Sequence, residues 1–291
     1  MNSYKLKAAF FILLASISYG SLGVIAKFAY ADGVSANMLA VSQMFFGALF
    51  FGLYKIKKLP TFFQVSKRSI VLLGVGGAMS ALTAFCYYRS LDTLAASVAI
   101  IMLFQFVWIG LALELAHKKR FPSRFEIVAV LLCYAGTYLS VGTSEATGGT
   151  LFGLFLGFIS GAFFAIYIFF SSTYCLDEDS GARAFWIIFS AFLLSFALSF
   201  LWLDFKNIYS VIKWGAVCGV FGVFIPFYIY ALFSPQIGAA ATSIIGSAEL
   251  PSALVLSVLI LDEKLTAMQV LGSALVFLAI FVIFFGEAKA K

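Results

Sequence analysis

Residues 237–251 read Ile-Gly-Ala-Ala-Ala-Thr-Ser-Ile-Ile-Gly-Ser-Ala-Glu-Leu-Pro, a run of small and apolar side chains that ends with one acid and one proline. Residues 94–108 read Leu-Ala-Ala-Ser-Val-Ala-Ile-Ile-Met-Leu-Phe-Gln-Phe-Val-Trp and have the same layout. Each run is followed by a charged turn, at 117–120 or at 262–264, and then by another apolar run. The two runs lie 143 to 144 residues apart, about half the chain. Self-similar halves in an apolar chain point to a transporter built from a duplicated unit.

The composition indicates a membrane protein. Of the 291 residues, 63% are hydrophobic and 11% are charged, whereas roughly a quarter of a soluble domain is charged. A bilayer core about 30 Å thick needs about 20 apolar residues per helix, and barrel strands would be shorter and would alternate in polarity. We therefore expect an all-α integral membrane protein with ten transmembrane helices. The expected spans are 8–30, 36–54, 69–91, 95–116, 124–142, 150–174, 184–203, 211–233, 239–261 and 266–286.

Basic residues are distributed unevenly over the expected loops. The outer set is small: Arg89, Lys206, Lys213 and Lys264, with Lys27 near the outer end of the first span. This asymmetry follows the positive-inside rule and places both termini in the cytoplasm. It also explains the net charge of +6 without nucleic acid as a partner. The inner set is Lys5, Lys7, Lys55, Lys57, Lys58, Lys67, Arg68, Lys118, Lys119, Arg120, Arg124, Arg183, Lys289 and Lys291.

Motifs for enzyme chemistry are missing from the sequence. The one histidine, His117, sits in a basic turn, and no Ser-His-Asp set or Walker loop is present. The four cysteines have neither disulfide nor zinc spacing. The first apolar run, about 23 residues, is too long for the core of a cleavable leader, so it reads as the first helix. We expect no enzyme, no metal and no cofactor.

Five expected spans per half imply that the halves have opposite orientations. A five-span unit that starts inside ends outside, so its duplicate runs through the membrane upside down. The first spans also match, because Ser16-Ile-Ser-Tyr-Gly-Ser-Leu-Gly23 aligns with Gly161-Ala-Phe-Phe-Ala-Ile-Tyr-Ile168 at an offset of 145. We expect two inverted five-helix repeats, one at 1–145 and the other at 146–291.

Glu249 is the clearest case of a charged residue within an expected apolar span. A charge at the centre of a bilayer costs at least ~3 kcal/mol, so it should be paired, hydrated or functional. Glu249 lies near the middle of the span at 239–261, and Pro251 is expected to kink that helix. The acid could bind a cationic group of a substrate or carry a coupling proton, because burial favours the neutral acid. Alternatively, it is a structural acid paired with Arg89 or Lys27.

Other polar and aromatic residues inside the spans are weaker candidates. Gln105 and Trp108 are three residues apart and share a helix face; they could line a cavity or pack between helices. Gln43 could form an interhelical hydrogen bond or line the cavity, and Pro226 is expected to kink the eighth span. Three tyrosines could supply cavity hydroxyls: Tyr167, Tyr228 and Tyr230.

The arrangement resembles the EamA-like transporters of the drug/metabolite transporter superfamily. The resemblance covers essentially the whole chain and implies that helices one, three, four, six, eight and nine surround a central cavity, which Gln105, Trp108, Tyr167, Tyr228 and Glu249 could reach. Two features depart from the family pattern, since Leu250 separates the acid from Pro251 and Gln43 stands where an Arg is common. The matching segments are Tyr19-Gly20, Ala95-Ala-Ser97, Gly238-Ala-Ala-Ala-Thr-Ser243, Ala248-Glu-Leu-Pro251 and Leu261-Asp-Glu-Lys-Leu-Thr266.

The prediction is a secondary-type carrier in the cell (inner) membrane. It would export a small organic solute, an amino acid or a related metabolite, by alternating access around a midplane cavity, with protons as a candidate coupling ion. One alternative is uptake of a small cationic metabolite, such as a quaternary amine drawn to aromatic faces and an acid. Another is a membrane scaffold or lipid scramblase that transports no solute. The lipid bilayer is the other expected partner, and no oligomeric state is indicated.

Overall fold

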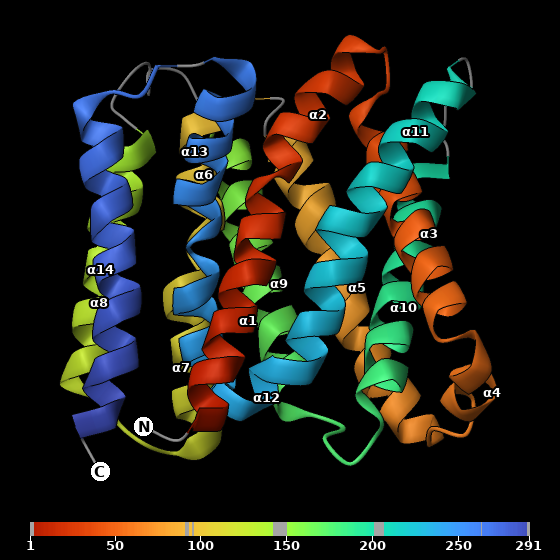
Figure 1. Cartoon of the computed structure of the whole chain (residues 1–291), viewed down its shortest axis with the longest axis horizontal. Helices are drawn as coiled ribbons and strands as arrows, with labels where there is room; N and C mark the ends of the chain where they lie inside the picture. Colours follow the sequence, from red (N-terminus) through yellow and green to blue (C-terminus); the bar gives the residue numbers. More distant parts are fainter. Residues whose placement is uncertain are drawn as a thin grey trace.

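The computed structural model describes residues 3–90, 93–94, 96–141, 150–200, 207–262 and 264–289, and every regular element within these ranges is helical. The helices stand side by side as an upright bundle (Figure 1). The end at which α1 begins and α14 ends is called the terminal end, and the end at which α2 finishes is the far end. The elements are α1 (Ser3–Gly20), α2 (Leu22–Ala31), α3 (Ala36–Tyr54), η1 (Ile56–Lys58), α4 (Leu59–Phe62), α5 (Lys67–Ser90), α6 (Ala96–Leu103), α7 (Phe106–Lys118), α8 (Arg124–Val141), α9 (Leu151–Thr173), α10 (Ser180–Ser199), α11 (Ile208–Cys218), η3 (Gly219–Phe224), α12 (Ile225–Gly246), α13 (Glu249–Leu261) and α14 (Ala267–Lys289).

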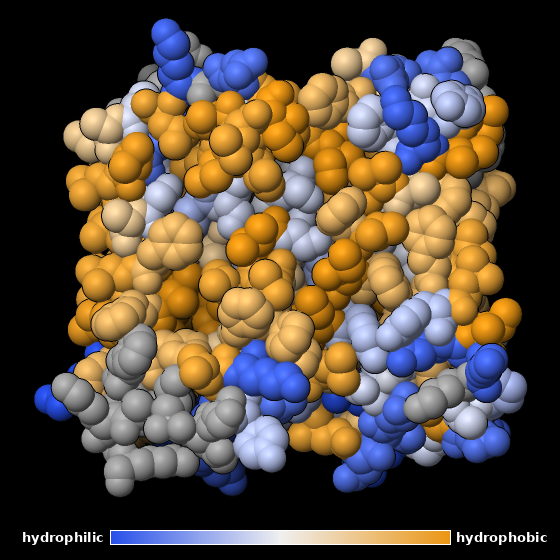
Figure 2. All heavy atoms as spheres, viewed as in Figure 1, coloured by the Kyte–Doolittle hydropathy of each residue, from blue (hydrophilic) through white to orange (hydrophobic). Residues whose placement is uncertain are grey.

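The outer surface has the polarity that a bilayer requires. Figure 2 shows a wide apolar band between polar caps at the two ends of the bundle. Large apolar side chains of the helices are exposed, among them Phe155 (56% exposed) and Leu131 (63% exposed). Such a surface would aggregate in water but is solvated by acyl chains. The all-helical part of the sequence prediction is confirmed.

Eight stretches of the described chain are long and apolar enough to cross a membrane. One of them, Ile208–Gly246, has 39 residues, about 58 Å of helix, which is about twice the thickness of a bilayer core. Gly238, with φ 85° and ψ 170°, divides this stretch at the terminal end, and Glu249–Leu261 is a further, shorter apolar helix. The other seven stretches are Tyr4–Ala31, Ala36–Tyr54, Lys67–Ser90, Val98–Lys118, Leu151–Thr173, Ser180–Ser199 and Ala267–Phe284. Ten crossings and cytoplasmic termini stay predictions.

Helix pairing follows the internal duplication. α5 packs along α9, as α12 packs along α1, and each pair joins the first half to the second. α8 and α14 form a pair at one edge of the bundle (Figure 1). Their axes approach closely because Gly136 and Gly272 face each other, and a Cβ on either would lie within 2.7 Å of the other's carbonyl oxygen. Small residues of this kind let helices pack in lipid, where burial of apolar surface provides no driving force.

Two helices are interrupted at equivalent places in the halves. A turn at Phe104–Gln105 separates α6 from α7, and a turn at Ser247–Ala248, 143 residues later, separates α12 from α13. The helices that follow these turns end alike, since Lys119 (φ 50°) and Asp262 (φ 54°) are left-handed cap residues that are also 143 apart. The two interrupted helices run in opposite directions, with α7 toward the terminal end and α13 toward the far end (Figure 1).

The first helices of the halves support these interruptions in parallel ways. Ser16 of α1 donates a hydrogen bond to the carbonyl of Ile245, at 3.3 Å, just before the second turn. Gly161 of α9, 145 residues after Ser16, lies against the carbonyls of Met102 and Leu103, just before the first turn. Met102 precedes Ile245 by 143 residues, so the same contact is made twice by duplicated segments.

Two prolines leave carbonyl groups without backbone donors. Pro226 follows the π-helical segment η3, in which the carbonyl of Phe221 would bond to residue 226. Ser18 of α1 donates to that carbonyl instead, at 2.5 Å. The helix continues through Pro226, so the expected kink takes the form of a π-helical segment that precedes the proline.

Arg183 supplies a hydrogen-bond donor that the second proline lacks. Pro235 cannot donate to the carbonyl of Ala231, four residues before it, and Arg183 Nη1 donates to this carbonyl at 2.9 Å. Its Nη2 donates to the carbonyl of Ser171, near the end of α9. The expected role of Arg183 as a loop charge is therefore corrected: the residue is buried, at 3% exposed, because it replaces missing backbone donors.

Substitution Arg183→Met should lower the stability of the folded protein by about 1–3 kcal/mol, because it leaves buried carbonyls without donors. Adding Pro235→Ala should recover part of this loss, because the alanine supplies an N–H group to Ala231. Thermal unfolding of the single and double variants in detergent would measure both effects. Equal stability of Arg183→Met and the parent protein would contradict this account, as would no recovery in the double variant.

Candidate functional site

Glu249 opens a helix in the interior of the bundle. It is the first residue of α13, directly after the turn at Ser247–Ala248. Pro251 therefore lies in the first turn of α13, where a missing N–H group is tolerated. The expected kink at Pro251 is located a few residues earlier, at Ser247–Ala248, where the α-helical pattern gives way to a tighter turn with hydrogen bonds between residues three apart. The N-terminus of a helix favours negative charge, so the backbone places a partial positive charge near the acid.

Three tyrosines lie within electrostatic range of the acid. Tyr19 of α1, Tyr87 of α5 and Tyr230 of α12 are all close enough to interact electrostatically with Glu249. Glu249 keeps part of its surface accessible although protein encloses it. Tyr19 and Tyr87 are also partly accessible, whereas Tyr230 is buried, at 1% exposed. Three helices distant in sequence thus bring hydroxyl groups to one carboxyl group.

The Glu249 side chain makes no hydrogen bond or ion pair with any other residue that the structure describes. The alternative expectation, a structural pair with Arg89 or Lys27, does not appear within these ranges. Leaving an acid without a partner in apolar surroundings is costly, and such residues in membrane proteins mark functional sites.

An aromatic cluster extends from this acid toward the terminal end. The ring centroids of Tyr167 and Phe227 are 4.9 Å apart, those of Tyr167 and Tyr230 are 6.3 Å apart, and those of Tyr19 and Tyr230 are 6.0 Å apart. Tyr167 is fully buried, and its hydroxyl lies near that of Tyr19 without a hydrogen bond of normal geometry to a described residue. Tyr167 therefore belongs to the surroundings of Glu249.

Gln105 and Trp108 form a separate network in the first half. Gln105 Oε1 accepts hydrogen bonds from Trp108 Nε1, at 2.8 Å, and from the Tyr134 hydroxyl on α8. Its amide nitrogen donates to the carbonyl of Ile101 at 3.1 Å. Trp108 is 40% exposed. Both residues share a helix face, as expected, but their hydrogen bonds lead toward α8, away from the acid.

The two interruptions nevertheless meet inside the bundle. A Cβ on Gly246, before the second turn, would lie 3.4 Å from the Tyr230 hydroxyl and 3.7 Å from the ring of Phe106, after the first turn. Cys133 of α8 contacts Ser247 at 3.3 Å between Sγ and Oγ. The turn with the acid and the turn with the glutamine are therefore neighbours across the repeat.

Tyr228 and Gln43 lie elsewhere. The ring of Tyr228 is 5.1 Å from Lys55 Nζ and packs against Tyr54, at the end of α3. Hydrogen bonding to Tyr228 raises the pKa of Lys55, which is outside the apolar spans. Gln43 is buried on α3, and its backbone carbonyl would be 3.1 Å from a Cβ on Gly219. Neither side chain makes a hydrogen bond or ion pair with Glu249.

Glu114 is a structural acid that the sequence analysis did not single out. Its Oε2 accepts from the backbone N–H of Ala240 at 2.7 Å, directly after the non-helical Gly238. Its Oε1 accepts from Lys118 at 2.7 Å, and Arg120 links it to Glu126. A carboxylate that caps a helix start is a familiar stabilising device. The sequence feature that could have identified Glu114 is an acidic residue within an apolar run, next to a basic turn.

Tyr19 and Tyr87 are the other residues that sequence reasoning missed. Nothing in their local sequence distinguishes them from the exposed tyrosines, and only the packing of α1 and α5 brings them within electrostatic range of Glu249. Within the described ranges, no three His, Cys, Asp or Glu side chains gather to hold a metal ion. The chemistry available at this site is that of one acid, several hydroxyls and aromatic faces.

Comparisons with known proteins agree on the kind of fold. The model of a family described as "EamA-like transporter family" matches residues 6–142 and 151–285. A solved structure, described only as "Crystal structure of protein", has a TM-score of 0.78 and 13% sequence identity. The match covers 98% of this chain and 99% of that one, and at this identity it shows the fold alone. No curated protein matched the chain.

Substitution Gly20→Ala should separate α1 from α13 next to Glu249. Its Cβ would lie 2.7 Å from the Glu249 carbonyl oxygen and 2.9 Å from the backbone nitrogen of Ala253, and backbone atoms there cannot move aside. We expect a loss of about 1–3 kcal/mol in stability. Gly23→Ala is the matched control, because nothing lies within 4 Å of its added Cβ. Thermal unfolding of both variants tests this contact, and equal midpoints would show that α1 and α13 are not tightly packed.

Proposed function

Because this chain belongs to the EamA-like transporter family, a family of multi-pass membrane proteins, we propose that it is a secondary carrier that exports a small organic solute. The proposed substrate class is an amino acid or related metabolite that carries an amino group. Transport proceeds by alternating access, in which the two halves rock around a site near the middle of the bundle.

The observation that carries this proposal is the unpaired acid at the interruption between α12 and α13. A substrate amino group supplies the charge that Glu249 lacks among the described residues. Hydroxyl groups of Tyr19 and Tyr87 are placed to accept or donate further hydrogen bonds to the same solute. Substrate sites in transporters with inverted repeats lie where helices are interrupted near the midplane.

The duplicated interruptions suit alternating access. Gly110 of α7 packs directly on Ser243 before the second turn, and a Cβ there would be 2.3 Å from Ser243 Oγ. Smooth contacts of this kind let one half move against the other, and the turns at 104–105 and 247–248 are places where the backbone can absorb the change. Glu249 releases or accepts a proton as the site changes sides, which couples transport to the proton gradient.

The second candidate is uptake of a small cationic metabolite. Aromatic faces stabilise a quaternary amine, and Tyr19, Tyr167 and Tyr230 form a contiguous cluster beside the acid. Export and uptake use the same site and differ in the direction of the driving gradient. Scaffolding or lipid scrambling needs no solute site, so binding of a solute at Glu249 separates these alternatives.

Solute exchange tests the proposed function. The purified full-length chain is reconstituted into liposomes, and exchange of a panel of amino acids, amines and organic acids is measured with and without a pH gradient. We expect exchange of solutes that carry an amino group and none of simple organic acids. Failure to exchange any member of a broad panel, with scrambling of labelled lipids instead, would overturn the proposal.

Substitution Glu249→Gln should reduce exchange at least tenfold and remove its dependence on pH, because the amide can neither pair with a cation nor titrate. Asp262→Asn is the matched control, since asparagine tolerates the left-handed backbone at this loop position. The control should keep both rate and pH profile. An unchanged pH profile in Glu249→Gln would rule out proton coupling through this acid, and an unchanged rate would rule out substrate binding by it.

The proposal places the protein in the cell membrane with the terminal end in the cytoplasm. The test uses two single-cysteine variants, Phe121→Cys and Tyr209→Cys, of a chain whose four native cysteines are replaced by alanine. Position 121 lies at the terminal end and is 94% exposed, and position 209 lies at the far end and is 79% exposed. A membrane-impermeant thiol reagent should label position 209 in intact cells, and position 121 only after the membrane is permeabilised. The reverse pattern would invert the assigned orientation.

A further inference from the structure

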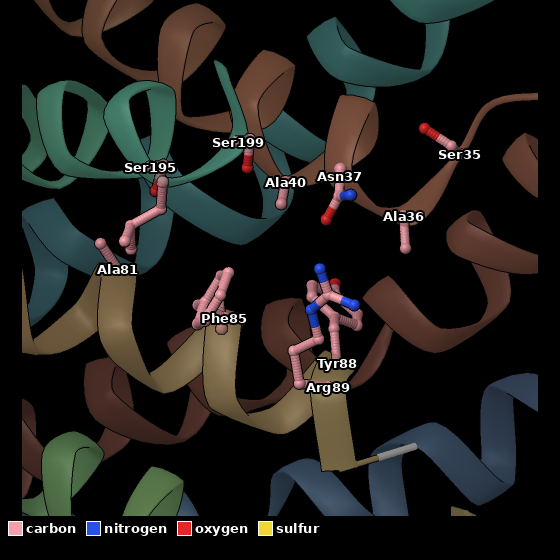
Figure 3. A pocket seen from close by; sticks show the side chains of 12 residues that line it. Ser35, Ala36, Asn37, Ala40, Ala81, Phe85, Tyr88, Arg89, Ser195 and Ser199 are labelled. Atoms are coloured by element: carbon pink, nitrogen blue, oxygen red, sulfur yellow. The ribbon is translucent and has the colours of Figure 1, made fainter. Parts of the chain in front are cut away.

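A pocket of about 140 Å³ lies toward the far end, between α3, α5 and α10. A water molecule needs roughly 10–15 Å³ of such volume, so the pocket has room for about ten waters or for one small organic ion. Figure 3 shows Asn37 and Arg89 pointing toward each other across it, with Ser195 and Ser199 on the facing helix. The pocket is distinct from the Glu249 site, because neither Glu249 nor Tyr87 is among its lining residues.

Polar groups of the pocket have unused hydrogen-bonding capacity. Ser195 and Ser199 are buried, at 7% and 5% exposed. Neither hydroxyl bonds to another residue in the described ranges, although a helical serine usually bonds to its own backbone. The side-chain amide of Asn37 is likewise without a partner there. Two nearly buried serines and a partly exposed amide, none of them hydrogen-bonded to a described residue, thus line one pocket, and a polar occupant would satisfy them.

Arg89 brings a cationic hydrogen-bond donor to the pocket. Arg89 is the one ionisable group other than the Tyr88 hydroxyl among the lining residues. The guanidinium also lies over the ring of Phe85, 5.8 Å from its centroid, and this contact orients it. The first residues of α3, Ala36 and Asn37, line the pocket as well, and N–H groups in the first turn of a helix have no intrahelical partner. A cationic fork together with N–H and O–H donors suits an oxyanion.

The geometry points to an oxyanion-binding site at Arg89, Asn37, Ser195 and Ser199, which takes the carboxylate or phosphate group of a small solute or of a lipid. Arg89 binds the anionic oxygens, and Asn37 with the two serines supplies further donors. Small apolar side chains such as Ala81 and Ala84 leave space beside them for a short hydrocarbon part. This site does not depend on the proposed transport function, and it prefers the opposite charge to that of the Glu249 site.

Thermal unfolding in nanodiscs tests this site with defined probes. The full-length chain in pure phosphatidylcholine is titrated with sodium acetate or inorganic phosphate against sodium chloride of equal ionic strength. We expect acetate or phosphate to stabilise the protein, and Arg89→Gln to weaken the apparent affinity about tenfold or more, as loss of a charge-assisted hydrogen bond does. Lys213→Gln, which removes another far-end cation that pairs with Asp32, should leave the affinity unchanged.

A second experiment, with an anionic lipid, distinguishes a lipid headgroup from a free solute as the source of the oxyanion. Stabilisation by phosphatidylglycerol in the nanodisc, lost in Arg89→Gln and absent with free acetate and phosphate, identifies a lipid headgroup as the ligand. Stabilisation by the free anions identifies a solute. No stabilisation in either arm, or equal stabilisation of the parent protein and Arg89→Gln, would overturn the proposal.

A thiol probe keeps the test decisive if Arg89→Gln does not fold. In the chain with its four native cysteines replaced by alanine, Ser199→Cys places a thiol in the pocket. An anionic methanethiosulfonate reagent should modify this thiol several-fold faster than a cationic one, and acetate or phosphate should slow the reaction. Equal rates for the two reagents, or faster reaction with the cationic one, would refute an anion-selective pocket.

Discussion

Backbone hydrogen bonding in an apolar environment is the constraint on which this structure depends. Away from water, each unmatched N–H or C=O group costs several kcal/mol, so a helix that is interrupted there needs partners from elsewhere. This bundle interrupts or distorts its helices repeatedly, and side chains of other helices take over the missing bonds. The pairs are Ser18 with the carbonyl of Phe221, Arg183 with that of Ala231, and Glu114 with the N–H of Ala240.

The same constraint determines where an acid can reside. A helix that begins inside the bundle directs the positive end of its dipole there, and this makes a neighbouring carboxylate less costly. Glu249 occupies this place at the start of α13. Glu114 shows the contrasting case, because its oxygens are occupied by a backbone N–H, a lysine and an arginine. The comparison separates an acid that stabilises the fold from one whose charge remains available.

Duplication produced two similar interruptions that have since acquired different surroundings. In the first half, Gln105 bonds to Trp108 and Tyr134 and is satisfied within the protein. In the second half, Glu249 meets tyrosines from three other helices and finds no partner among the described residues. The two turns share a backbone geometry, and the difference between their side chains is the reason that the proposed substrate site lies in the second copy. A separate pocket around Arg89 adds a region of opposite charge preference near the far end.

The sequence by itself determined the helical fold, its strongly apolar character, the repeat near 143 residues and the exceptional position of Glu249. These features depend on local hydrophobicity and on self-similarity, which can be read along the chain. Only the tertiary structure decided which residues meet Glu249, why Arg183 is buried, and that Gln105 turns toward α8. These outcomes depend on how helices distant in sequence cross at small residues such as Gly20 and Gly161, and apolar periodicity carries no information about the partner of a given face.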